Sequence, residues 1–174
     1  MKDIKRKYQH FSKGFTFIEI VIVIAVIGVI ALAIYPSVQN TLQTRLFENT
    51  AKDILTTMQK AKFQAVKTKL NHRVRFDLRN TIWYFFIEQE TALNAWNKMT
   101  GFVDKSIPPQ FNVTMSLQDQ TVVFSSLGLV SNFVTTHNSI VLQSDKLKGY
   151  NRDDERIINV YAGGSIQYVK ARSS

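Results

Sequence analysis

The stretch KGFTFIEIVIVIAVIGVIALAIYPSVQN, residues 13–40, is almost continuously apolar and decides how the rest of the chain can be arranged. Residues 15–35 make 21 positions, and Glu19 is the one charged residue among them. At about 1.5 Å per residue a helix of this length spans roughly 30 Å, the thickness of a bilayer core. A secretory signal peptide would be shorter, with about 7–15 apolar residues before a small-residue cleavage site. No such site follows here, so the stretch predicts one retained membrane helix.

The charge of the chain is concentrated at its beginning. The 174 residues carry a net charge of +9, and the first fourteen supply 5 − 1 = +4 of it, from Lys2, Lys5, Arg6, Lys7 and Lys13 against Asp3. Because basic flanks of a membrane helix stay cytoplasmic, we expect a single-pass protein of the inner membrane with a cytoplasmic N-terminus and a periplasmic domain. There are no cysteines, which excludes disulfides, thiolate metal sites and a cysteine nucleophile.

Glu19 is an unusual residue at the head of a membrane helix. An ionised acid in the bilayer core costs about 2.5–3.5 kcal/mol on insertion scales. A place in the first helical turn lowers that cost, because the helix N-terminus carries partial positive charge. A cation at the same depth would lower it further. The simpler alternative is an interfacial glutamate solvated by lipid headgroups.

The segment Lys13-Gly14-Phe15-Thr16-Phe17-Ile18-Glu19, between a basic leader and an apolar helix, resembles the processing site of type IV prepilins and type II secretion pseudopilins. The resemblance implies that a prepilin peptidase/methyltransferase cuts between Gly14 and Phe15 and N-methylates Phe15. It also implies that Glu19 pairs with the Phe15 amine of a neighbouring subunit in a filament. The implied partners are other pseudopilins or pilins, the inner-membrane assembly platform and membrane lipid. Pro36 falls where many of these proteins carry a proline, and we expect it to kink the helix.

Helical periodicity continues beyond the membrane segment. Apolar residues spaced 4, 3, 4, 3 and 4 apart make one stripe, namely Phe47, Ala51, Ile54, Met58, Ala61 and Ala65. Lysines occupy the other side and predict a solvated face, namely Lys52, Lys60 and Lys67. The expected organisation is a cleaved leader at 1–14, a transmembrane and assembly helix at 15–35, an amphipathic continuation of that helix at 36–70, and a β-rich globular domain at 71–174.

Short strands replace the helical pattern after residue 71. Alternation or β-branched and aromatic composition predicts strands at 73–78, 81–88, 111–117, 121–125, 139–143, 156–162 and 165–170. Residues 78–81 predict a turn, residues 90–110 read as irregular, and Gly163-Gly164 indicates a two-residue hairpin. A long helix followed by antiparallel strands predicts an α+β, pilin-like fold in which the helix packs on the sheets.

The strand region carries a second resemblance. The stretches RVRFD, WYFF, VVFSSLG, SIVLQ and RIINVYAGGSIQY resemble the H-type minor pseudopilins and the related FimT-like minor pilins. This implies two sheets beside the helix. It also implies a structural subunit of the type II secretion pseudopilus, which drives protein export. The alternative is a minor type IV pilin of a pilus, DNA-uptake or competence system.

The sequence offers little for catalysis or metal binding. The three histidines lack metal-site spacing, and no nucleophile or phosphate-binding motif occurs. We therefore expect neither enzymatic activity nor a cofactor. The densest acid cluster is Asp153-Asp154-Glu155, a weak calcium candidate. Its spacing does not match an EF-hand, and the flanking Arg152 and Arg156 favour an exposed loop.

Basic residues near two strands keep a nucleic-acid partner open as the alternative. Arg73 and Arg75 share one strand face, and Lys170 and Arg172 lie close to the C-terminus. Phosphate binding requires Lys and Arg side chains clustered on one face. An exposed basic surface without a DNA partner is the simpler interpretation of these four residues.

Overall fold

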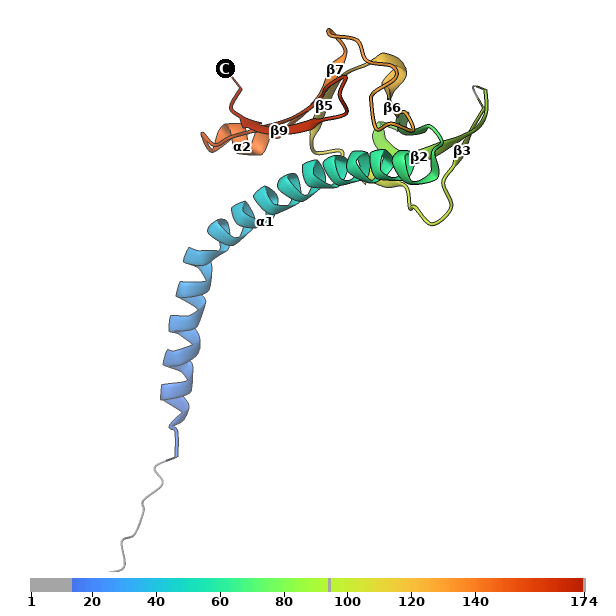
Figure 1. The fold of residues 1–174 in the computed structure, drawn as a ribbon. Coiled ribbons are helices and arrows are strands. Elements are labelled where there is room, and N and C mark those ends of the chain that lie inside the picture. Colours follow the sequence, from blue (N-terminus) through green and yellow to red (C-terminus); the bar gives the residue numbers. More distant parts are fainter. Residues whose placement is uncertain (1–13, 94, 174) are drawn as a thin grey trace, which may run out of the picture. The chain divides into compact units, whose positions relative to one another are not determined.

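A computed structural model describes residues 14–93 and 95–173 of the chain. The longest element is α1 (Phe17–Thr68), a helix of 52 residues, which is followed by the strands (Figure 1). The chain divides into two compact units, Met1–Leu42 and Gln43–Ser174. The helix begins in the first unit and ends in the second.

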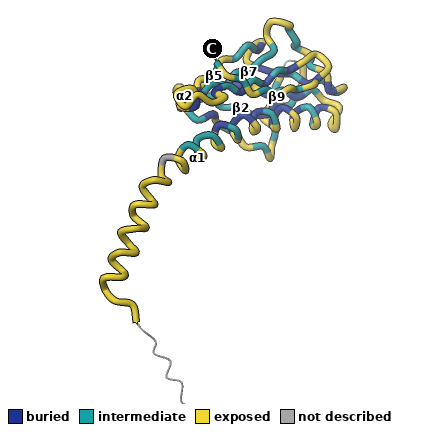
Figure 2. Tube along the Cα trace, turned by 90° about the vertical axis from the view of Figure 1, so that its left-hand side faces the viewer, coloured by how far each residue is buried: buried dark blue, intermediate teal, exposed yellow. Residues whose placement is uncertain are grey.

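The described part of the first unit is the apolar half of α1. This half contains a window long and apolar enough to span a membrane, and none of that window is buried within the protein. Figure 2 shows this segment as exposed, and residues 15–35 are all exposed. An apolar surface of this size needs lipid or another protein to cover it. Pro36 lies inside α1, so it does not end the helix, and the kink expected there remains a prediction.

The second half of α1 contributes one wall of the core of the second unit. All six residues of the predicted apolar stripe are fully buried, from Phe47 to Ala65. The three lysines predicted on the other side are exposed. The helical periodicity therefore identified both the length of the helix and the face that it buries.

One sheet of the second unit has five strands, β1 (His72–Arg79), β2 (Ile82–Ala92), β3 (Ala95–Lys98), β4 (Lys105–Ile107) and β6 (Thr121–Phe124). The order is β3-β2-β1-β6, and β4 also pairs with β2. In the antiparallel register Val74 lies opposite Ile87 on one side and Val122 on the other. All three are buried, so one face of this sheet belongs to the core.

The other sheet has four antiparallel strands in the order β5-β7-β8-β9. Their bounds are β5 (Asn112–Leu117), β7 (Asn138–Gln143), β8 (Glu155–Val160) and β9 (Ile166–Ala171). Two short helices, η1 (Gln118–Gln120) and α2 (Asp145–Gly149), lie between strands. One hydrophobic cluster joins α1 to both sheets, and its fully or partly buried members all fall between Phe47 and Tyr168. The second unit therefore contains the whole of its own core.

The α+β prediction is confirmed, with two local corrections. Residues 90–110 are not wholly irregular, because the short strands β3 and β4 both pair with β2. Strands this short have too few positions to show a periodicity. The hairpin at Gly163-Gly164 is also wider than two residues, since β8 ends at Val160 and β9 begins at Ile166. Within that loop Gly164 takes the left-handed conformation, with φ +72°.

Candidate functional site

The bond that the sequence marks for cleavage lies in a short non-helical stretch before α1. Gly14 and Phe15 are both exposed, and 82% of the surface of Phe15 is accessible. Among the described residues other than its chain neighbours, none has an atom within 4 Å of a Cβ built at Gly14. A protease reaching this bond would therefore meet an unobstructed backbone.

Glu19 is held by a reciprocal pair of contacts with Thr16 at the start of α1. The backbone N–H of Thr16 donates to Glu19 Oε2 at 2.8 Å, and the Thr16 hydroxyl donates to the same oxygen at 2.9 Å. In return, the Glu19 N–H donates to Thr16 Oγ1 at 3.3 Å. This is a capping box, in which a threonine and a glutamate three residues later satisfy backbone donors that a helix start leaves unpaired. Glu19 therefore has a role within its own chain.

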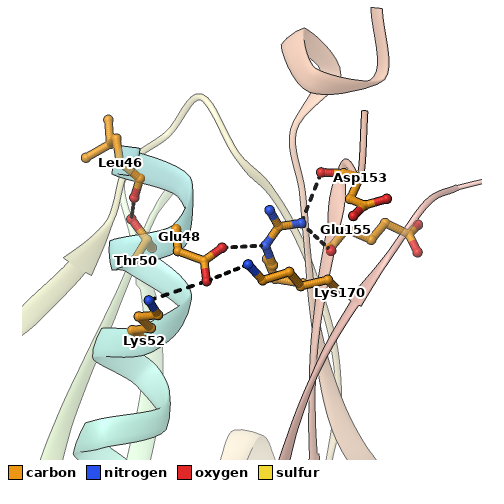
Figure 3. A network of polar contacts seen from close by, with 8 residues as sticks. Leu46, Glu48, Thr50, Lys52, Asp153, Glu155 and Lys170 are labelled. Carbon is orange, nitrogen blue, oxygen red and sulfur yellow. Dashed lines mark hydrogen bonds and ion pairs between the residues drawn. The ribbon is translucent and has the colours of Figure 1, made fainter. Parts of the chain in front are cut away.

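A second polar cluster joins α1 to the four-stranded sheet (Figure 3). Arg156 Nε donates to Glu48 Oε2 at 3.0 Å, and Lys170 Nζ lies 3.1 Å from Glu48 Oε1. Lys52, one helical turn further along α1, lies 3.6 Å from the same Oε1. The Arg156 guanidinium also lies over the Phe47 ring, 4.8 Å from its centroid. The cluster fixes the helix to β8 and β9 through charge-assisted hydrogen bonds.

The environment of Glu48 strongly favours its ionised form. Burial disfavours the carboxylate, but the hydrogen bonds from Arg156 and Lys170 outweigh burial and lower the Glu48 pKa to about 2. Burial also raises the pKa of the nearby Tyr168 hydroxyl. Glu48 is therefore ionised at neutral pH.

The acid cluster before β8 has a structural use. Asp154 is fully buried, and its carboxylate accepts hydrogen bonds from the Ser173 backbone N–H at 2.9 Å and from the Ser173 hydroxyl at 2.6 Å. Burial opposes ionisation, but these bonds and one from Gln143 lower the Asp154 pKa to about 2. The exposed loop predicted here is wrong for Asp154 and for Arg156, which is 3% exposed. Within residues 14–93 and 95–173, no group of three or more His, Cys, Asp or Glu side chains is placed to hold a metal.

The four candidate DNA-contact residues lie on different sheets. Arg73 and Arg75 are on β1, whereas Lys170 is on β9 and Arg172 follows that strand. Two of the four are already paired with acids. Arg73 Nε donates to Glu88 Oε2 at 2.5 Å and stacks over Trp96, and Lys170 is bound to Glu48.

The start of the chain can now be compared with known proteins. Residues 10–35 match the family model of the prokaryotic N-terminal methylation motif. The chain carries this motif. The match includes the Gly14–Phe15 bond, the Thr16–Glu19 capping box and the apolar part of α1 to Tyr35. The prediction of a prepilin-type methylation motif is confirmed.

The fold also resembles that of a solved structure. It resembles the minor pseudopilin EpsH from the type 2 secretion system of Vibrio cholerae, with a TM-score of 0.54 and 15% sequence identity. The likeness covers 71% of this chain and 95% of that one. No curated protein matches the sequence. At this identity the likeness shows the fold, and the fold is pilin-like.

Sequence reasoning missed three residues that organise these sites. Thr16 could have been found, since Thr16-x-x-Glu19 before an apolar run is the sequence signature of a capping box. Glu48 and Arg156 gave no such signal, because they meet only in the folded protein and are 108 positions apart.

Proposed function

We propose that this protein is a minor pseudopilin of the H type, a structural subunit of a type II secretion pseudopilus. The observation that carries the proposal is the combination of a methylation motif at residues 10–35 with the fold of a minor pseudopilin. The subunit is held in the inner membrane by residues 15–35, with its N-terminus cytoplasmic and the second unit periplasmic. A prepilin peptidase cuts it after Gly14 and methylates Phe15, and the subunit then joins other pseudopilins at the assembly platform.

In this proposal Glu19 guides assembly, and its geometry supports that role. All the hydrogen bonds that Glu19 accepts from Thr16 go to Oε2. Among the described residues, none donates a hydrogen bond to Oε1. The capping box therefore orients the carboxylate and leaves one oxygen for the Phe15 amine of a neighbouring subunit. That amine remains a cation after methylation, so a charge-assisted hydrogen bond can form.

Two substitutions separate the charge of Glu19 from its capping role. A glutamine can serve at this position of a capping box, so Glu19→Gln keeps the cap and removes the charge. Glu19→Val removes both. We expect both variants to insert and to be cut, as judged by intact mass, and both to enter filaments poorly.

The outcomes distinguish the possible roles. If Glu19→Gln enters filaments like the parent and Glu19→Val does not, capping alone matters and the ion pair is wrong. If Glu19→Val also assembles normally, Glu19 does not set the register. If intact mass shows that the parent protein does not begin at Phe15, the proposed cleavage after Gly14 is wrong.

The rival function is a minor type IV pilin that binds DNA. The pairing of Arg73 with Glu88 and of Lys170 with Glu48 counts against the rival, because these carboxylates already partly neutralise two of the four cations that would face phosphates. A gel-shift titration of Gln43–Ser174 at several salt concentrations tests the rival. Tight binding with a steep salt dependence, abolished by charge reversal at Arg73, Arg75, Lys170 and Arg172, would favour DNA uptake.

A further inference from the structure

An exposed apolar patch lies on the second unit where α1 meets the loop after β6. It consists of Phe63 and Val66 of α1 and of Leu127 and Leu129 of the loop, which are 64%, 39%, 77% and 46% exposed. Phe63 and Val66 are neighbours on one helical face because they are three positions apart. Gly128 joins the two parts, since a Cβ built there would lie 3.1 Å from Val66 Cγ2. We call these four side chains the Leu127 patch.

The loop that carries Leu127 is held in one conformation. The Gly128 N–H closes a turn by donating to the Ser125 oxygen at 2.8 Å, and the Ser125 N–H donates to the Leu129 oxygen at 2.8 Å. Gly128 is buried and has φ +78°, a conformation that glycine adopts readily. Exposed leucines do not stabilise a folded chain in water. Held rigidly, however, they can serve as anchors for a partner, because little ordering is then needed on binding.

The same loop is fixed to the elements around it. A Cβ built at Gly128 would lie 3.2 Å from Lys62 Cε of α1, and the Lys62 ammonium donates to the Gly164 oxygen at 2.8 Å. The Val130 N–H donates to the Ala162 oxygen at 3.0 Å. The end of α1, the loop after β6 and the β8–β9 loop therefore meet at the patch. All three belong to the second unit, so the patch is complete within that unit.

The segments that meet at the patch contain no acid. Residues 54–76, 120–144 and 156–174 have neither Asp nor Glu. Three exposed lysines lie near Phe63 and Val66 in the chain, namely Lys60, Lys67 and Lys69. Among the residues that the structure describes, no carboxylate lies within ion-pair distance of these three. The rim of the patch on the side of α1 is therefore cationic.

Acids on the neighbouring strand β2 do not cancel this charge. Glu88 is paired with Arg73. Glu90 accepts a hydrogen bond from Asn71 Nδ2 at 2.6 Å and supplies one negative charge against the three lysines. The fourth lysine of this region, Lys62, donates to a neutral backbone oxygen. The surroundings of the patch keep a net positive charge when these pairs are counted.

We propose that the Leu127 patch binds an apolar and acidic surface of another protein. The exposed leucines and Phe63 contact its apolar centre, and the lysines face carboxylates at its rim. A second copy of this chain does not fit, because a self-complementary contact would bring the lysines of both copies together. Nucleic acid fits less well, since it is held through phosphates and stacked bases, which do not use aliphatic leucines. The inference goes beyond the proposed function and does not depend on which filament the subunit joins.

A peptide of defined chemistry tests the proposal on Gln43–Ser174, which contains its whole core. The probe is a synthetic helix with leucines on one face and glutamates beside them, and amide NMR signals of the fragment are followed during the titration. We expect saturable binding with a dissociation constant below about 1 mM, and the largest shifts at residues 62–67 and 125–130. Peptides with serine in place of leucine, or lysine in place of glutamate, should not bind. No binding of the first peptide, or equal binding of all three, overturns the proposal.

Matched variants locate the binding. Leu127→Ala should lower the affinity for the peptide about tenfold, as truncation of an interface anchor does. The control is Val103→Ala, which truncates an 85% exposed side chain between β3 and β4 and should change the affinity by less than about twofold. Lys67→Glu should lower the affinity about fivefold, whereas Lys146→Glu on α2 should not. Equal losses for Leu127→Ala and Val103→Ala would show that the patch is not the site.

Two other probes distinguish other classes of occupant. Phosphatidylglycerol vesicles and a single-stranded oligonucleotide are titrated into the parent fragment and into Leu127→Ala. We expect any binding of these probes to be independent of Leu127, because it would come from the lysines alone. If Leu127→Ala weakens the binding of vesicles or oligonucleotide and leaves peptide binding unchanged, the occupant is lipid or nucleic acid and the protein assignment is wrong.

Photo-crosslinking of the full chain in cells supplies the last readout. A photo-crosslinking amino acid replaces Leu127 in one strain and Val103 in the control strain, and mass spectrometry maps the crosslinked segment of the partner. We expect a product at position 127 whose segment is apolar and carries net negative charge, and much less of it at position 103. A product with a second copy of this chain, equal products at both positions, or none at position 127 overturns the proposal.

Discussion

Replacing Gly164 by alanine should strongly destabilise the second unit. Gly164 lies in the β8–β9 loop with φ +72°, and a Cβ built there would lie 1.9 Å from the backbone oxygen of Gly128. The loop is locked in this position, since Lys62 of α1 donates to the Gly164 oxygen at 2.8 Å and the Val130 N–H donates to Ala162 at 3.0 Å. The new methyl group therefore cannot be accommodated without moving contacts to α1 and to both sheets.

The expected loss can be built from its parts. A left-handed conformation costs a non-glycine residue about 1–2 kcal/mol. The separation of 1.9 Å is well short of the roughly 3.5 Å that non-bonded heavy atoms prefer, and overpacking of this kind costs about 1–3 kcal/mol. Alanine regains about 0.4–1 kcal/mol by restricting the unfolded chain. The free energy of unfolding should fall by about 1–4.5 kcal/mol.

Two other glycines separate these contributions. Gly101 has φ +88° and no atom within 4 Å of a built Cβ, so Gly101→Ala should cost only the backbone term, about 1 kcal/mol. Gly163 is equally open and carries no positive φ, so Gly163→Ala should change the free energy by less than about 0.5 kcal/mol. Urea unfolding of Gln43–Ser174, followed by circular dichroism, measures all three. A loss for Gly164→Ala no larger than that for Gly101→Ala would refute the interlock between the loops.

Two further predictions concern the same fragment. Thr81 is a β-branched residue with φ 66° in the two-residue turn between β1 and β2, and this backbone conformation costs about 1–3 kcal/mol. Thr81→Gly should therefore raise the free energy of unfolding by about 0.5–1.5 kcal/mol in the same urea assay. A lower free energy of unfolding in the variant would show that the turn is not strained. The folded-state pKa values of Glu48 and Asp154 are about 2, below their ordinary values of 4.5 and 3.8, so the stability that they supply is complete above about pH 5 and is lost as the pH falls toward 2. Ionised Glu48 contributes on the order of 3 kcal/mol of this stability. The curves of unfolding free energy against pH for the parent and for Glu48→Gln should therefore converge in acid. Parallel curves would show that the Glu48 pKa is not lowered by folding.

The helix and its buried face were readable from the sequence for a physical reason. A stripe such as Phe47–Ala65 must repeat at the helical period to lie against one surface, so burial leaves a pattern in the chain. All five strands predicted after residue 110 are present for the corresponding reason, since burial of one face or both leaves apolar residues in a short run. Local periodicity in the sequence was therefore sufficient to predict the helix and most of the strands.

The polar clusters left no local pattern. Arg156 looked like the flank of an exposed acidic loop because its partner, Glu48, lies on α1, far away in sequence. Asp154 was read as exposed because the group that satisfies it, Ser173, comes from the end of the chain. A buried ion is tolerated only with partners, and the partners are set by the tertiary fold. The capping box differs, since its two residues are three positions apart and could have been recognised.

The position of α1 determines how the second unit responds to mechanical force. A subunit pulled by its apolar segment receives the load through a continuous helix, and the buried side chains from Phe47 to Ala65 pass it to the core. No strand is joined directly to the pulled end, because β1 follows the far end of α1 and the strand nearest the other terminus is β9. The Glu48 cluster and the Lys62–Gly164 bond, which tie this half of α1 to the rest of the second unit, resist its removal from the core.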